Sequence, residues 1–373
     1  MEENGMGNRL DAYRGCLLGL AAGDAMGYTV ANQSLEQIRQ NYGPNGLLGY
    51  DLVNGYAYVT SHTQIAAYTC NGLLMGVTRG QMRGVMAPYV RYVALAEQEW
   101  AKYQSYRRDP NYLNHCWISR EQDLRFRRCM DTLMLDTVTR GAFGTMEGQR
   151  NRYQSPGSIT AAVPVGLFFD PNRLDRSEVV RLGAEVVALT HGNPLAFLAG
   201  AALAYIISRI TWDGDRDLRA VGKDTIAMLK ETYSRDYPKQ VNEITFQLQA
   251  ALSLAGTPGM SEPEALDQIY CDTASKVVAG ALYVSILHSR SLDEALIAAV
   301  NHTGESAAVG AVTGAIVGAM VGQEGIPGFY LEGLEPAEIL RTLAEDMFQG
   351  CPMERMSNFF DCEWEEKYIA PGN

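Results

Sequence analysis

Closely spaced cysteine pairs and a block of basic residues are both missing from this 373-residue sequence. The seven cysteines are scattered and odd in number, and none forms a Cys-x-x-Cys pair, so neither a disulfide framework nor a zinc knuckle is indicated. The N-terminal MEENGMGNRL lacks the basic and apolar regions of a signal peptide. We therefore expect most cysteines to be buried thiols in a cytoplasmic protein.

Positive charge is also scarce. The chain has 31 Lys and Arg against 43 Asp and Glu, a net charge of −12, without a basic block that would neutralise a phosphate backbone. The longest uncharged stretches, 193–208 and 306–323, are rich in glycine and alanine. They are shorter than, or barely reach, the roughly 18 to 20 residues that a membrane span needs. We expect both to be buried core helices, and neither nucleic acid nor a membrane to be a partner.

Strand-like alternation of apolar and polar residues is nearly absent. Apolar residues recur at helical spacing instead, as in VVRLGAEVVALT and TASKVVAGALYVSILHS. No linker or repeat divides the chain, and a loop is predicted at about 104–114. We therefore predict an all-α fold, a single domain over residues 1–373. Helix N-caps are expected at Asp175, Asp215, Ser261 and Ser291.

Glycine, in contrast, is abundant and patterned. Two sets spaced by four residues each form one stripe along a predicted helix: Gly15, Gly19, Gly23 and Gly27, and Gly310, Gly314, Gly318 and Gly322. Each glycine costs a helix about 1 kcal/mol relative to alanine, so a compensation is needed. A stripe without side chains lets another helix approach closely. We hypothesise that both helices pack in the core of the bundle, against each other or against other helices.

Two helix starts carry small polar residues. Thr60 is predicted to cap a helix whose first turn holds Ser61, His62 and Thr63. Exposed amide groups and the helix dipole at such a start favour an anion.

The second start lies some 240 residues further on. Thr303 or Gly304 precedes a helix with Glu305 and Ser306 in its first turn, which leads into the second glycine stripe. The two starts are candidates to converge on one site, although N-caps are too common for this signal to be specific.

Other polar residues stand in apolar segments. Asp24 is the single charge in GCLLGLAAGDAMGYTV, and a buried carboxylate needs a partner, so it either caps a helix or faces a polar pocket. His191 and Asn193 precede a predicted buried helix, where a turn with a hydrogen-bonded histidine is commoner than a ligand site.

Five segments resemble, in order, motifs of the ADP-ribosylglycohydrolases, which include the dinitrogenase reductase-activating glycohydrolase. GCLLGLAAGDAMGYTV resembles their G-x-x-x-G-x-A-x-G-D-A-x-G opening, and VTSHTQIAAYTCNGLLMG their T-D-D-T-Q helix. GSITAAVPVGLF, with Gly157 and Ser158, is similar to G-x-M-R-x-A-P-x-G. LTHGNPLAFLAGAALA resembles T-H-x-x-P-x-A, and AVNHTGESAAVGAVTGAIVGAMVGQEGIP their closing N-x-G-G-D-S-D-T block. The match runs from about 14 to 327, and residues 328–373 are expected to add helices that complete the bundle.

This resemblance implies an all-α bundle that binds two Mg²⁺ ions between the first turns of two helices. It also implies hydrolysis of an N- or O-glycosidic bond between ADP-ribose and an acceptor. Only Thr60, and Glu305 as a longer carboxylate, remain as candidate ligands, because the family's ligand positions fall on Thr60, Ser61, His62, Glu305, Ala307 and Ala308. Magnesium is held by oxygen ligands that include carboxylates. We therefore expect no metal and no other cofactor, with Mg²⁺ only if the family site partly survives.

The leading hypothesis is a pseudoenzyme that binds ADP-ribose, a related nucleotide or a protein partner such as an ADP-ribosylated protein. Its expected ligand-binding residues are Asp24, Thr60, Ser61, His62, Thr63, Gly157, Ser158, His191, Asn193, Gly304, Glu305 and Ser306. One alternative is an active hydrolase, metal-independent or with a single metal, in which His62 and Glu305 are catalytic. Another is an interaction or scaffold protein with a pocket filled by Tyr58, Tyr28 or Met26. Whether the protein is an enzyme, its acceptor and its oligomeric state stay open.

Overall fold

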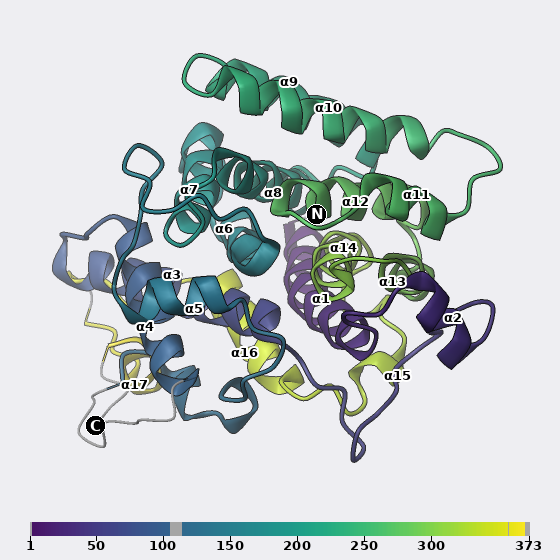
Figure 1. Cartoon of the computed structure of the whole chain (residues 1–373). Helices are drawn as coiled ribbons and strands as arrows, with labels where there is room; N and C mark the ends of the chain where they lie inside the picture. The colour runs from purple at the N-terminus through teal and green to yellow at the C-terminus, as the bar shows by residue number, and fades with distance from the viewer. Residues whose placement is uncertain (1, 105–113, 357, 370–373) are drawn as a thin grey trace.

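The computed structural model describes residues 2–104, 114–356 and 358–369, and the loop predicted at about 104–114 lies outside them except for its ends. Within these residues the regular structure is helical (Figure 1). Two isolated β-bridges, Val53 to Tyr56 and Ala57 to Leu334, are the pairings outside helices. The all-α prediction is confirmed.

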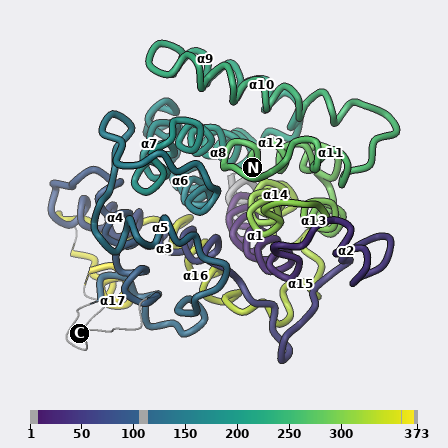
Figure 2. The backbone as a smooth tube through the Cα atoms, in the orientation of Figure 1, coloured from purple at the N-terminus to yellow at the C-terminus, as the bar shows by residue number. Residues whose placement is uncertain are grey.

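Two helices from opposite ends of the chain form the centre of the bundle. α1 (Glu2–Thr29) and α14 (Ser306–Val321) lie side by side along their lengths, as the tube trace in Figure 2 shows. A Cβ atom added at Gly19 would lie 2.2 Å from the carbonyl oxygen of Gly314, and one added at Gly23 would lie 1.9 Å from that of Gly310. Only glycine permits backbones this close. The predicted packing of the two stripes is confirmed, and the helices pack against each other.

The central pair is enclosed by further apolar helices. α13 (Leu292–Val300), α12 (Ala274–Leu287), α8 (Pro194–Trp212) and α16 (Ala337–Gln349) pack around it. Within the described residues α8 is the one helix long and apolar enough to cross a membrane, and 83% of its apolar window is buried inside the protein. That burial is typical of a core helix, which is what the sequence predicted for this stretch.

Two groups of helices lie next to each other beside the central pair (Figure 1). α3 (Ser61–Arg83) packs against α4 (Tyr89–Gln104), and α6 (Ala162–Phe168) and α7 (Arg176–Ala188) pack against α8. The hairpin of α9 (Leu218–Tyr233) and α10 (Pro238–Leu254) covers α8 and α12 from outside. The remaining elements are α2 (Leu35–Tyr42), α5 (Thr132–Thr139), α11 (Glu262–Ile269), α15 (Gly328–Leu331), α17 (Cys362–Tyr368) and the 3₁₀ segments η1 (Trp117–Arg120), η2 (Gln122–Leu124) and η3 (Pro156–Ala161).

The helix starts test the predicted N-caps. Asp175, Ser261 and Ser291 cap α7, α11 and α13 as expected. The prediction at Asp215 is wrong: Asp217 caps α9, while Asp215 accepts a hydrogen bond from the guanidinium of Arg209 at 2.7 Å. Asp215 and Asp217 are equally suited by chemistry to cap a helix. Asp215 is instead paired with Arg209 of the preceding helix, and Asp217 forms the cap.

Candidate functional site

The start of α3 is held in place by a carboxylate of α1. Asp24 Oδ2 accepts hydrogen bonds from the amides of Thr60 and Thr63 at 2.8 and 3.1 Å and from the Thr63 hydroxyl at 2.6 Å. Asp24 Oδ1 accepts from the Thr60 hydroxyl at 2.6 Å. All three side chains are completely buried. Asp24 therefore caps a neighbouring helix, the first of the two roles expected for it, and Thr60 is the N-cap as predicted.

The first-turn amides of α3 have no capacity left for a ligand. Besides Thr63, the amide of Ser61 donates to the Arg128 carbonyl at 3.4 Å, and that of His62 donates to the Thr60 hydroxyl at 3.2 Å. The expectation of an exposed, anion-binding helix start is therefore wrong here. The reason is that a buried carboxylate, a hydroxyl and a neighbouring loop already satisfy the groups that an anion would need.

At the start of α14, in contrast to α3, the side chain of the N-cap residue makes no capping hydrogen bond. Glu305 is its N-cap residue, and its amide donates to the Cys271 carbonyl at 3.1 Å, but its carboxylate makes no capping hydrogen bond. Ser306 donates its hydroxyl to the His302 carbonyl at 3.3 Å. Gly304 adopts a φ of 143°, a conformation that L side chains rarely adopt. The chain thus turns sharply before α14 and leaves the Glu305 carboxylate exposed.

The two helix starts do converge on one pocket, of about 420 Å³. Four predicted residues line it together: Ser61 and His62 of α3, Gly157 of η3, and Glu305 before α14. The remaining lining residues come from the loop between α1 and α2, from the start of α5 with the residues before it, and from the start of η3. They are Asn32, Cys129, Met130, Asp131, Thr132, Leu133, Ser155 and Pro156.

The other predicted residues do not line the pocket. Asp24, Thr60 and Thr63 form the buried cap of α3 and do not line the pocket. Neither do Ser158, His191, Asn193, Gly304 and Ser306. Asn193 instead caps α8 through its side chain, which accepts from the Leu195 amide at 3.0 Å. Among the side chains expected to fill the pocket, none of Tyr28, Met26 and Tyr58 lines it, so it is open.

Asp131 is the main residue of the pocket that sequence reasoning missed. Its Oδ1 caps α5 by accepting from the amides of Leu133 and Met134 at 2.9 and 3.0 Å. Its Oδ2 accepts from the Ser155 hydroxyl at 2.5 Å and lies 3.3 Å from His191 Nε2. Burial opposes ionisation of this carboxylate, but the hydrogen bond and charge of His191 and the remaining hydrogen bonds outweigh it, so the pKa of Asp131 is lowered.

His191 is fully buried and anchors this carboxylate from behind. Its Nδ1 lies 2.7 Å from the Ser158 hydroxyl and 2.9 Å from that of Thr190. A Cβ at Gly157 would lie 2.5 Å from Asp131, so glycine lets the carboxylate approach η3. The buried residues His191 and Ser158 therefore act on the pocket by positioning the Asp131 carboxylate.

His62 and Glu305 share the pocket without an ion pair between them in the described structure. His62 is 4% exposed, and its Nδ1 atom is buried without a hydrogen-bond partner. Partial burial in the pocket raises the pKa of Glu305, the charge of His62 lowers it, and the charges of Asp131 and Asp272 raise it further. The exposed Glu305 carboxylate, which caps no helix, is therefore available for a ligand, whereas the unpaired Nδ1 of His62 is shielded from solvent.

Backbone strain marks the rim. Asn32 and Cys129 line the pocket with positive φ angles of 63° and 39°. Asparagine tolerates positive φ angles, so Asn32 in the ANQS turn was a weak sequence signal for this conformation. No sequence feature at Cys129 predicted its positive φ angle. Asp131 before TLML carried the ordinary signal of an N-cap, which does not reveal that its second oxygen reaches a pocket.

Comparison with known proteins places the chain. The family model described as ADP-ribosylglycohydrolase matches residues 6–355. The chain belongs to the ADP-ribosylglycohydrolase family. One solved structure, titled "ADP-ribosylglycohydrolase-related protein complex", is similar over 92% of this chain and 98% of that chain, with 20% identity and a TM-score of 0.56, which shows the same fold. No curated protein sequence matches.

The residues of this member of the ADP-ribosylglycohydrolase family do not fit the magnesium pair that the family resemblance implies. The Thr60 hydroxyl donates to Asp24, and the Ser61 hydroxyl lies 3.3 Å from the Cys129 carbonyl. Ala307 and Ala308 offer no side-chain ligand. Within the described ranges no group of three His, Cys, Asp or Glu side chains is arranged to hold a metal ion. Two divalent cations need several carboxylate oxygens nearby, and these positions supply only Glu305.

Proposed function

We propose that this member of the ADP-ribosylglycohydrolase family is a pseudoenzyme that binds ADP-ribose or a related nucleotide without a divalent metal. The observation that carries the proposal is the pocket itself. It remains open between the starts of α3 and α14, although the metal-ligand positions hold Ser61, His62, Ala307 and Ala308. An open, polar pocket without the family's metal donors favours binding over metal-assisted hydrolysis.

The charges of the pocket indicate which part of the ligand enters it. Asp131 and Glu305 line it, and no Lys or Arg is among its lining residues. Carboxylates accept hydrogen bonds from hydroxyl groups but repel phosphate. We therefore propose that the ribose enters the pocket with its hydroxyls donating to Glu305, and that the diphosphate lies towards solvent.

The test is calorimetric titration of ADP-ribose, ribose and ADP into chelator-treated protein, with Glu305→Gln as the variant. The Glu305 carboxylate caps nothing, so this variant is expected to fold normally. We expect ADP-ribose to bind and the variant to bind it about tenfold more weakly, the cost of roughly one charge-assisted hydrogen bond. Glu231→Gln on the exposed face of α9 is the matched control. Equal binding by Glu305→Gln and the control would remove the pocket from the proposal.

A second candidate is a hydrolase that cleaves the glycosidic bond of an ADP-ribosylated acceptor without metal. It is favoured by the presence of an imidazole, His62, and a carboxylate that caps no helix, Glu305, in the lining of one pocket. General acid–base catalysis requires such a pair within reach of the substrate. Release of ADP-ribose from a modified protein in the presence of chelator would support it, provided that His62→Ala and Glu305→Gln abolish the release. Release that persists in both variants would exclude these residues as the catalysts.

A further inference from the structure

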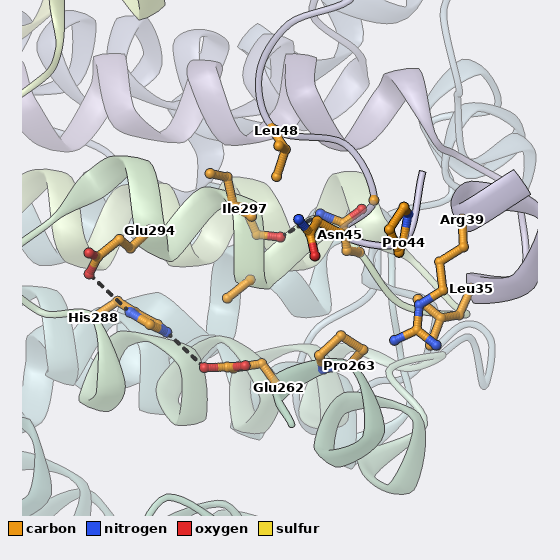
Figure 3. Close-up of a pocket in the computed structure, with 13 residues that line it drawn as sticks. Leu35, Arg39, Pro44, Asn45, Leu48, Glu262, Pro263, His288, Glu294 and Ile297 are labelled. Atoms are coloured by element: carbon orange, nitrogen blue, oxygen red, sulfur yellow. Dashed lines mark hydrogen bonds and ion pairs between the residues drawn. The ribbon is translucent and has the colours of Figure 1, made fainter. Parts of the chain in front are cut away.

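A second cleft lies away from the family pocket, between α2, α11 and α13 (Figure 3). It has a volume of about 390 Å³ and shares no lining residue with the pocket at α3. Figure 3 shows charged side chains at its two ends: Glu294, His288 and Glu262 at one end, and Arg39 at the other. The cleft therefore has a negative end and a positive end.

The negative end is built around an imidazole. His288, at the C-terminus of α12, lies with Nε2 3.3 Å from Glu262 Oε1 and with Nδ1 3.4 Å from Glu294 Oε2. Only a protonated ring donates to both carboxylates, and even then their two charges exceed its one. The second oxygen of each carboxylate has no partner in the described structure. The Glu262 and Glu294 side chains are 37% and 66% exposed, so a cationic group from solvent can reach them.

The positive end is the guanidinium of Arg39 on α2. Arg39 is exposed and makes no ion pair or side-chain hydrogen bond within the part of the chain that the structure describes. The carboxylate of Glu264 lies within range of its charge but is held in the capping box of α11, where it accepts from the Ser261 amide at 3.2 Å. Arg39 is thus available for an anionic group of a ligand.

The wall between these ends is largely apolar. Figure 3 shows Pro263, Pro44 and Ile297 between the charged groups, and Leu35 and Leu48 also line the cleft. Leu48 is 56% exposed, so its side chain is accessible to the apolar part of a ligand in the cleft. An apolar trough between opposite charges is complementary to a molecule with an apolar stem and a charge of each sign at its ends.

We propose that this cleft is a second binding site, which takes a linear zwitterion with an aliphatic stem, such as an ω-amino acid. Its ammonium group binds Glu262 and Glu294, its stem lies on the apolar wall, and its carboxylate binds Arg39. The site is independent of the proposed function, because the two cavities have no residue in common.

The experiment uses the full chain and a series of ω-amino acids of increasing length, from aminobutanoate to aminododecanoate, followed by calorimetry or ligand-observed NMR. The variants are Arg39→Gln and Glu294→Gln, both at exposed side chains, with Glu231→Gln as the matched control. An alkylamine and an alkanoate of the best length serve as ligands with a single charge. ADP-ribose binding is measured in parallel to separate this site from the pocket at α3.

We expect one chain length to bind best, and each variant to weaken that ligand about tenfold or more, since each removes one charge-assisted contact. The control is expected to bind like the unmodified protein. The proposal is overturned if no member of the series binds at millimolar concentration, if both variants bind as well as the control, or if the alkylamine alone binds as tightly as the zwitterion.

Discussion

Replacing Asp24 separates its capping role from a role in ligand binding. Asp24→Ala removes the acceptor for four hydrogen bonds, two from the amides of Thr60 and Thr63 and two from their hydroxyls. Each buried donor left without a partner costs about 1 to 3 kcal/mol. The hydroxyls can turn towards other acceptors, so the two amides dominate, and we expect a loss of about 4 kcal/mol in the free energy of unfolding.

The matched control is Asp175→Ala, which removes the exposed N-cap of α7. An ordinary N-cap of this kind contributes about 1 kcal/mol. Urea denaturation followed by circular dichroism gives both free energies. The reasoning fails if Asp24→Ala is no less stable than Asp175→Ala. If the variant also keeps its stability but loses ADP-ribose binding, Asp24 is a ligand-binding residue, contrary to the geometry described above.

Three further substitutions and one reactivity follow from the same structure. Gly23→Ala is expected to cost about 3 kcal/mol or more, because its Cβ would lie 1.9 Å from a backbone oxygen of α14, whereas Gly49→Ala, with nothing within 4 Å of the new atom, should be neutral in the same thermal melt. Burial raises the pKa of Glu97 from 4.5 to about 8. Because the folded state then holds a proton that the unfolded state releases, stability should fall by up to about 5 kcal/mol as pH rises through this window. Glu97→Gln should abolish that fall in melts recorded across the pH range, and an unchanged slope would contradict the assignment. Burial and the charges of Asp24 and Glu305 raise the pKa of Cys129 to about 11; a thiol reagent at neutral pH should therefore label exposed Cys362 faster than exposed Cys129, as peptide mass spectrometry would show.

Local signals in the sequence predicted much of the architecture. The glycine stripes require close backbone contact wherever they pack, so close packing of both helices in the core followed from the spacing and the cost of glycine in a helix, while the structure showed that α1 and α14 are each other's partners. Thr60 followed from the preference of helix starts for hydroxyl side chains. Each of these two predictions depended only on residues close together within one helix.

The pocket was less predictable because its groups come from distant segments. Asp131 and His191 are 60 residues apart, and only the fold brings the carboxylate to Ser155 and the imidazole. The prediction of an anion site at the start of α3 was wrong for the same reason, because it depended on a residue from a distant segment. An exposed helix start and one capped by Asp24 from another helix look alike in sequence, since the cap lies 36 residues away.

The central claim is that the pocket binds its ligand without a divalent metal. It is tested most directly by titrating ADP-ribose into chelator-treated protein by calorimetry, with and without millimolar Mg²⁺. Binding of equal affinity in both runs is the predicted result, because Glu305 supplies the only carboxylate at the family's ligand positions. Binding that appears or tightens strongly only with Mg²⁺ would contradict the claim, and so would the absence of binding in both.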